Sequence, residues 1–150
     1  MNSESGNQAD GTPEEDATTT GEPLRREHRA VIAGHGNFAS GLVSAVQQIA
    51  GKGDTFVAIS NAGLSGTDIE STIVAALEAS GAGVLFTDLP AGSCTMSARR
   101  LQRSRPGLVV VTGVNLATAL EFAFRSPEES ATEAATAAAE KGRATLLVYS

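Results

Sequence analysis

Short apolar runs alternate with segments of helical periodicity along most of this chain, and this alternation restricts the possible folds more than any other feature. The apolar runs lie at 30–33, 55–60, 84–87 and 108–112, and a fifth, ATLLVY, lies at 144–149. Between two of them, Ile69, Ile73 and Leu77 lie four residues apart and therefore on one helical face. Strands that alternate with helices predict an α/β fold with a doubly wound, mainly parallel sheet, right-handed crossovers and helices on both faces.

Further helices are expected at 39–50, 93–102 and 115–124, followed by an alanine-rich helix near the C-terminus. In the helix at 93–102, Met96 and Leu101 are expected on the inner face. The alanine-rich helix is expected to start at Ser126-Pro127, because serine caps helices and proline fits their first position. It is expected to end near Gly142, since glycine commonly stops a helix.

Residues 1–27 differ from the rest of the chain in composition. They are rich in Ser, Thr, Gly, Asp and Glu, and Leu24 is their only large aliphatic residue after Met1. Such a segment buries too little apolar surface to offset the conformational entropy that folding would cost. We therefore expect a disordered acidic tail at 1–27 and a single folded domain at 28–150.

Charge, cysteine content and hydropathy argue against several classes of protein. The formal net charge is −6, whereas nucleic-acid-binding proteins present basic surfaces. Cys94 is the only cysteine, so neither an internal disulfide nor a cysteine-based metal site is expected. No apolar run approaches the roughly 18 residues of a membrane span, and the N-terminus lacks the features of a signal peptide. A cytoplasmic protein is expected.

A histidine and an aspartate follow the first and third predicted strands. His35 comes directly after the run at 30–33 and Gly34, and Asp88 comes directly after the run at 84–87. In a sheet of order 2-1-3-4 these strands are neighbours at the switch point, where ligands bind. The two side chains should therefore lie side by side. A carboxylate that accepts the Nδ1 hydrogen fixes the imidazole tautomer and leaves Nε2 free as a nucleophile.

The loops around this pair are suited to holding an anion. Gly34, Gly36 and Asn37 flank His35 just before a predicted helix, and Gly92 precedes Ser93, which is expected to cap the next helix. The N–H groups at helix N-termini bind phosphate well. Two such termini converging on a histidine predict a phosphoryl-binding site.

The segment from Gly34 to Ala39 also satisfies the dinucleotide fingerprint G-x-G-x-x-(G/A). That fingerprint requires an acidic residue at the end of the second strand, but this strand ends Ile59-Ser60-Asn61. Asp54 stands at the start of the strand, at the opposite edge of the sheet. A nucleotide-binding module is therefore a weaker alternative.

Three segments at strand ends resemble the IIA domains of the mannose/fructose/sorbose branch of the bacterial sugar phosphotransferase system (PTS). They are Gly34 to Leu42 (GHGNFASGL), Gly83 to Leu89 (GVLFTDL) and Val111 to Leu116 (VTGVNL). The first and third look most like the N-acetylgalactosamine or galactosamine subgroup. In place of the family's Asp-x-x-Gly-Gly-Ser/Thr-Pro loop, this chain has Ala91 at the first glycine and Cys94 at the proline.

The resemblance implies a phosphoryl carrier that needs neither metal nor organic cofactor. His35 would accept phosphate from phospho-HPr on Nε2 and pass it to a IIB component, Asp88 would orient the ring, and Ser93 would lie near the phosphoryl group. The membrane would be involved only indirectly, through the IIC/IID permease. The resemblance also implies a homodimer in which the strand at 144–149 pairs across the interface, since it would otherwise be an exposed edge. A regulatory phosphohistidine protein of the dihydroxyacetone-kinase type is an alternative.

Overall fold

A computed structural model describes residues 29–150, so the predicted tail at 1–27 lies outside the described residues. The strands are β2 (Ala30–Gly34), β3 (Phe56–Ser60), β4 (Val84–Thr87) and β5 (Val109–Thr112). The α-helices are α2 (Phe38–Ala50), α3 (Gly66–Ser80), α4 (Ser93–Ser104), α5 (Leu116–Phe124) and α6 (Ala131–Ala144), and a short 3₁₀ helix, η2 (Gly53–Thr55), precedes β3. This order of elements confirms the predicted alternation.

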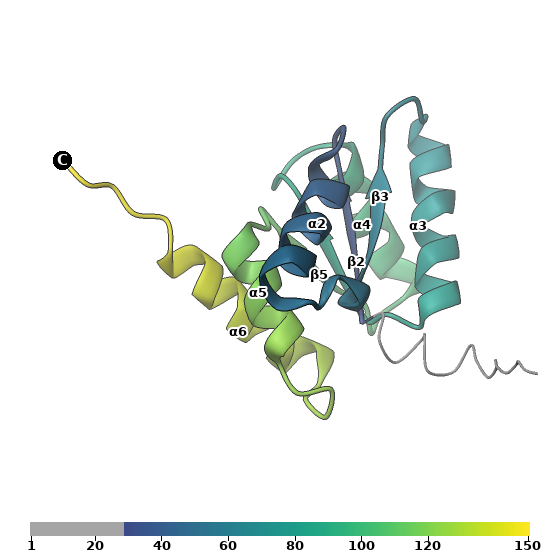
Figure 1. Ribbon diagram of the computed structural model, residues 1–150. Coiled ribbons are helices and arrows are strands. Elements are labelled where there is room, and N and C mark those ends of the chain that lie inside the picture. The colour runs from purple at the N-terminus through teal and green to yellow at the C-terminus, as the bar shows by residue number, and fades with distance from the viewer. Residues whose placement is uncertain (1–28) are drawn as a thin grey trace, which may run out of the picture.

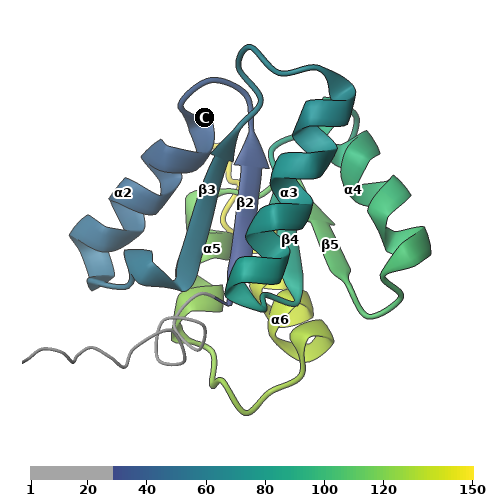
Figure 2. The same ribbon diagram turned by 90° about the vertical axis from the view of Figure 1, so that its right-hand side faces the viewer.

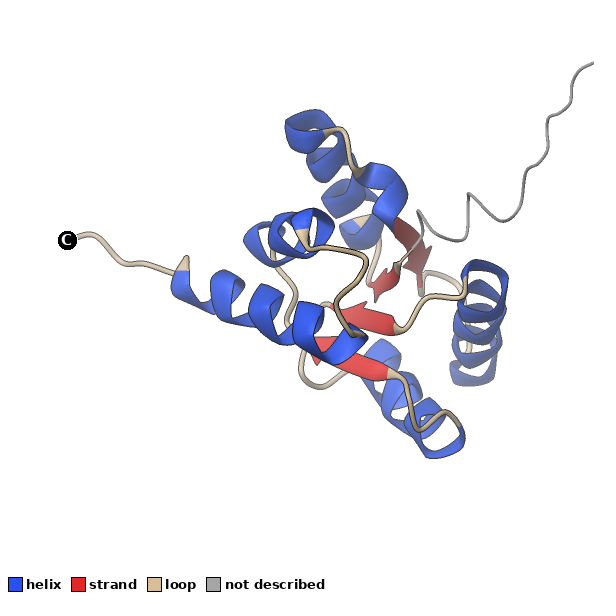
Figure 3. Cartoon of the chain, turned by 90° about the horizontal axis from the view of Figure 1, so that it is seen from below, coloured by secondary structure: helices blue, strands red, loops and turns tan. Residues whose placement is uncertain are grey.

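The four strands form one parallel sheet in the order β3-β2-β4-β5, which is the predicted order 2-1-3-4. Figure 2 shows α3 and α4 on one face of the sheet, and α2, α5 and α6 cover the other face (Figures 1 and 3). Successive residues of β2 point to opposite faces, so Ile32 joins the core under α2, α5 and α6, and Val31 joins the core under α3 and α4. Both faces of the central strands are therefore buried.

The start of α6 differs from the prediction. Ser126 and Pro127 belong to a turn, and the helix begins at Ala131 with Ser130 as its N-cap. The Ser130 hydroxyl accepts from the Glu133 N–H, and the Glu133 carboxylate accepts from the Ser130 N–H. This reciprocal capping box satisfies two helix-end donors, which outweighs the serine and proline four residues earlier.

The end of α6 also differs from the prediction, because Gly142 lies inside the helix rather than at its end. Its carbonyl accepts a hydrogen bond from the Asn115 side chain, and a Cβ on Gly142 would lie 1.7 Å from Oγ1 of Thr118. The glycine therefore permits close packing of α6 on α5.

We expect Gly142→Ala to lower the free energy of unfolding by about 1–3 kcal/mol, because overpacking of a close contact forces the helices apart. Gly41→Ala is the matched control: Gly41 lies within α2, and a methyl group added there would meet nothing within 4 Å, so that change should be neutral or stabilising. Urea denaturation of both variants measures the difference. Equal stability of the two variants would contradict the packing role.

The strand predicted at 144–149 does not form in the single chain. Ala144 ends α6, and the residues after Thr145 have no regular structure and extend away from the body of the molecule (Figure 1). Leu146, Val148 and Tyr149 are each more than four-fifths exposed. Within the described chain no strand lies beside this segment to satisfy its backbone hydrogen bonds, so it has nothing to pair with.

The predicted inner face of α4 was wrong at one position. Met96 is exposed, whereas Cys94, Ala98 and Leu101 are buried against the sheet.

Among the described residues, no helix combines the length and the apolarity needed to span a bilayer.

Candidate functional site

The carboxyl ends of β2, β3 and β4 meet at one edge of the sheet. β2 pairs in parallel with both neighbours, and its Ala33 lies opposite Thr87 of β4. Two residues after Ala33 comes His35, and one residue after Thr87 comes Asp88. The parallel register therefore brings these two side chains from segments 53 residues apart to the same place.

One carboxylate oxygen of Asp88 receives two hydrogen bonds from His35. The His35 backbone N–H donates to Oδ2 over 2.9 Å, and the ring Nδ1 lies 2.7 Å from the same oxygen. The His35 side chain is 53% exposed and that of Asp88 only 10% exposed. The carboxylate thus holds the ring by Nδ1, and among residues 29–150 no group bonds to Nε2.

The environment of Asp88 keeps its carboxyl group ionised. Burial raises the pKa of this carboxyl, but the hydrogen bonds from the His35 ring and backbone N–H more than offset burial, so that the pKa is lowered. An ionised carboxylate accepts the Nδ1 hydrogen and stabilises positive charge that develops on the ring.

Gly34 allows Asp88 to approach His35 this closely. A Cβ on Gly34 would lie 3.1 Å from Oδ2 of Asp88 and 3.0 Å from Cδ2 of Phe38. Gly36, directly after the histidine, has φ of +52°, a left-handed conformation that glycine adopts without strain. Gly34 therefore provides space for the side chains of Asp88 and Phe38, whereas Gly36 provides the backbone conformation of the turn.

Because a methyl group on Gly34 would displace the carboxylate, we expect Gly34→Ala to slow any reaction at Nε2 by on the order of tenfold. Gly66→Ala is the control, since Gly66 has open space around its Cβ position and lies at the start of α3. Initial rates of phosphoryl acceptance, the reaction that the family resemblance predicts for His35, would measure both variants. A Gly34→Ala rate equal to that of Gly66→Ala would show that the close approach is dispensable.

The loop before α4 passes over the imidazole ring. A Cβ on Gly92 would lie 3.6 Å from Cε1 of His35. Ser93 follows, but it does not cap the helix as predicted: the N-cap is Gly92, and Ser93 is the first residue of α4. The Ser93 hydroxyl instead accepts a hydrogen bond from the Asn61 side chain over 2.9 Å.

Asn61 is a residue of the site that the sequence analysis noted only as the end of a strand. Its backbone N–H donates to the Gly34 carbonyl, and its side chain reaches Ser93. Asn61 therefore ties the end of β3 to both loops beside His35. The sequence did hold a signal for Asn61. This residue directly follows β3, and the carboxyl ends of parallel strands lie at the same edge of the sheet as His35 and Asp88.

The α-helices differ in whether a side chain accepts a hydrogen bond from the N–H groups of the first turn. Side chains cap α3, α5 and α6, through Ser65, Asn115 and Ser130. The helices that begin beside His35 have no such cap: Asn37 precedes α2 and Gly92 precedes α4, each without a side-chain hydrogen bond. The Phe38 N–H donates to the His35 carbonyl, but the other N–H groups in the first turns of these two helices are left for another acceptor. An anion is the acceptor that the helix dipole favours.

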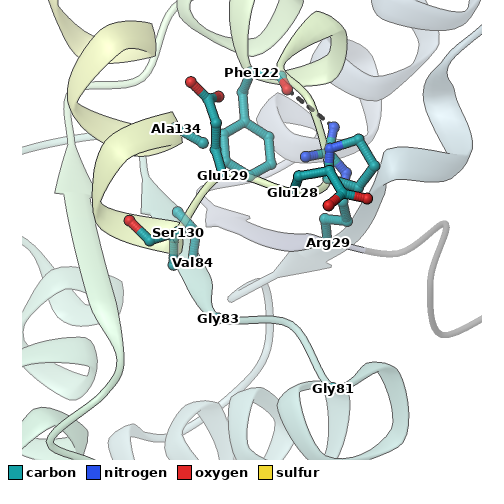
Figure 4. A pocket seen from close by; sticks show the side chains of 11 residues that line it. Arg29, Gly81, Gly83, Val84, Phe122, Glu128, Glu129, Ser130 and Ala134 are labelled. Atoms are coloured by element: carbon teal, nitrogen blue, oxygen red, sulfur yellow. Dashed lines mark hydrogen bonds between the residues drawn. The ribbon is translucent and has the colours of Figure 1, made fainter.

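A cavity of about 660 Å³ lies at the opposite edge of the sheet, at the start of α6 (Figure 4). Its wall includes Arg29, which donates to the carbonyl of Phe122 over 3.1 Å and lies over the Phe122 ring. The carbonyl belongs to the last turn of α5, where a cation stabilises the helix end. Arg29 has a structural role here, and the cavity is remote from His35.

Comparison with known proteins places this geometry in a family. Residues 29–140 match the family model described as the PTS system fructose IIA component. The chain belongs to this family. It is thus a IIA component of the sugar phosphotransferase system, and the predicted resemblance to the mannose/fructose/sorbose branch is confirmed. In the comparison with curated proteins, no protein matched.

Solved structures with the same fold are also IIA proteins. The mannose/sorbose-specific IIA subunit of Enterococcus faecalis shares 26% identity, with a TM-score of 0.71 and coverage of 81% of this chain and 94% of the subunit. EIIA from Streptococcus agalactiae shares 22% identity, with a TM-score of 0.68 and coverage of 80% and 95%. The IIA protein associated with the fucose utilization operon of Streptococcus pneumoniae shares 20%, with a TM-score of 0.69 and coverage of 80% and 91%. The likeness of this IIA component to the galactosamine subgroup stays a prediction.

Proposed function

We propose that His35 is the phosphoryl acceptor of this IIA component, taking phosphate from phospho-HPr and passing it to a IIB component for sugar uptake. The observation that carries the proposal is the double hydrogen bond from His35 to Asp88, which fixes Nδ1 and leaves Nε2 free at an exposed position. A metal or organic cofactor has no part in this reaction.

The reaction is a substitution at phosphorus. The lone pair of Nε2 forms a bond to the phosphorus atom while the bond from phosphorus to the donor nitrogen breaks, and its electron pair returns to the donor ring. The Nδ1 hydrogen stays on His35, so the phosphorylated ring is an imidazolium whose charge is balanced by the Asp88 carboxylate 2.7 Å away. Transfer to the IIB component reverses these steps.

The N-termini of α2 and α4 supply the phosphoryl-binding groups. Their uncapped N–H groups, on the loops that include Gly36, Asn37 and Gly92, balance charge on the phosphoryl oxygens. Because Asn61 donates to Oγ of Ser93, the Ser93 hydroxyl hydrogen is free to donate to a phosphoryl oxygen. Phosphoryl transfer depends mainly on such positioning and charge stabilisation.

Both partner proteins dock on the surface around His35. Exposed apolar side chains are carried by Phe38 at the start of α2, Leu89 next to Asp88 and Met96 in the first turn of α4. Exposed apolar groups that border a reactive side chain are typical of a protein-binding surface. HPr and the IIB component use this surface in turn, because each must bring its own reactive group to Nε2.

The experiment that tests the function is phosphate incorporation from labelled phosphoenolpyruvate into the full chain, with enzyme I and HPr from the same organism. The proposal predicts a label that is lost in acid and kept in alkali, as expected of a phosphohistidine. Absence of label under these conditions would overturn the proposal and direct attention to ligand binding in the same crevice.

We further propose that the protein is a homodimer in which residues 145–150 of each chain add to the sheet of the other. Within the described residues, β5 pairs only with β4, so its outer edge is open. A shallow cavity of about 440 Å³ runs along β5 and α6, between Val109–Thr112 and the Ala135–Arg143 face of α6. The apolar segment at 146–149 matches this edge in length and character.

Deletion of residues 145–150 should therefore convert a dimer into a monomer, because the deletion removes the only segment exchanged. Sedimentation equilibrium measures this against the chain mass of 15.3 kDa. Deletion of residues 1–27 is the control and should leave the dimer intact. A full-length chain that sediments as a monomer would contradict the exchange.

A further inference from the structure

Two buried hydroxyl groups lie beneath the loop that carries Asp88. Thr87, the last residue of β4, is fully buried, and Thr95, in the first turn of α4, is 5% exposed. Their Oγ1 atoms are 2.6 Å apart. The mechanism proposed above uses neither hydroxyl, yet buried hydroxyls are costly unless they form hydrogen bonds.

The distances favour one assignment of the hydrogens. The Thr95 hydroxyl donates to the carbonyl of Leu89, whereas Oγ1 of Thr87 is 3.5 Å from that carbonyl. Each hydroxyl has one hydrogen to donate. Thr87 therefore donates to Thr95, and Thr95 donates to Leu89, in a chain of two hydrogen bonds.

These two hydrogen bonds attach the Asp88 loop to α4, the helix that follows it. The Leu89 side chain is half-exposed, so packing holds the residue only in part, and its carbonyl supplies a further attachment. Asp88 is the neighbouring residue, and its carboxylate must point at the His35 ring within hydrogen-bond distance. Two residues before Thr95, Ser93 begins α4 beside the ring.

We propose that Thr95 is a positioning residue of the phosphoryl site. It does not touch His35. Its hydrogen bond to the Leu89 carbonyl sets the direction of the Asp88 carboxylate relative to the ring, and its place in α4 links that direction to the first N–H groups of the helix. This role rests on the proposed function of His35 as phosphoryl acceptor.

The test compares Thr95→Val, which keeps the shape and removes the hydroxyl, with Thr95→Ser, which keeps the hydroxyl. Thr118→Val is the matched control. Thr118 is equally buried, and its hydroxyl bonds to Asn115 at the start of α5 and not to a residue of the Asp88 loop. If Thr95→Val does not fold, Thr95→Ala removes the hydroxyl without placing a methyl group against the carbonyl.

Two measurements distinguish positioning from general stability. Nitrogen-15 NMR of the unphosphorylated protein reports which ring nitrogen of His35 carries the hydrogen, and the initial rate of labelling from phospho-HPr reports transfer. We expect Thr95→Val to reduce the Nδ1–H population and to slow transfer by about tenfold or more. Thr95→Ser should stay within about threefold of wild type, and Thr118→Val should match wild type in both measurements.

A Thr95→Val protein with the tautomer and transfer rate of Thr118→Val would overturn the positioning role. The NMR measurement needs no phosphoryl donor. If wild type failed to take up label, the proposed function would fall, whereas an unchanged His35 tautomer in Thr95→Val would separately refute the role of Thr95.

Discussion

His35→Gln is expected to take up no phosphate above background, while the protein remains folded. Within residues 29–150, the imidazole Nε2 is the only free ring nitrogen where the two uncapped helix N-termini converge, and an amide nitrogen is not a nucleophile at neutral pH. Because the ring is half-exposed and contributes little to the core, the protein should stay folded, and the loss of the ring's hydrogen bond to Asp88 should lower the free energy of unfolding by about 1–3 kcal/mol. Labelling from phosphoenolpyruvate, enzyme I and HPr measures the effect.

The chain offers a matched control, because it contains two histidines. His28→Gln should label as wild type does. If label survives in His35→Gln and disappears in His28→Gln, the phosphoryl acceptor is His28 and not His35, which would contradict the proposal. Label in both variants would place it on another residue type.

Asp88→Asn should lower the rate of phosphoryl transfer by on the order of 10²–10⁴-fold, the range expected when a histidine loses the carboxylate that fixes its tautomer. The amide has almost the same shape but no charge to balance the imidazolium that forms on transfer. Its NH₂ group also donates to a ring nitrogen and so favours the tautomer with hydrogen on Nε2, which removes the nucleophile. Asp68→Asn, at an exposed site in α3, is the control and should transfer at the wild-type rate.

The same pair makes a prediction for stability against pH. Since the pKa of Asp88 is lowered in the folded state, its stabilising contribution is complete above the ordinary carboxyl pKa and is lost as pH falls through the lowered value. The difference in unfolding free energy between wild type and Asp88→Asn should therefore shrink at acidic pH. A difference that grows on acidification would show that Asp88 is not held as a carboxylate by His35.

The sequence was sufficient to predict the sheet order and the meeting of His35 with Asp88. Apolar runs with intervening helical periodicity indicated a doubly wound sheet, and in the flavodoxin-like order adopted for it the ends of β2 and β4 are neighbours. Both predictions depend only on topology. They did not require any knowledge of side-chain packing.

The features that the sequence analysis missed depend on competition between local signals or on absent partners. Ser130 with Glu133 competes with Ser126 for the start of α6, and only the reciprocal hydrogen bonds decide between them. Gly142 is indistinguishable in sequence from a helix-ending glycine, because its role arises from contact with α5. The segment at 144–149 has strand composition but no neighbouring strand within its own chain, and the Asn61 and Thr95 contacts arise from loop geometry.

The most direct test of the account is to identify the phosphorylated atom by nitrogen-15 and phosphorus-31 NMR of the full chain after phosphorylation by phospho-HPr. Because Asp88 holds Nδ1 at 2.7 Å, we expect phosphorus bonded to Nε2 of His35. Phosphorus bonded to Nδ1, or to the hydroxyl of Ser93, would contradict it.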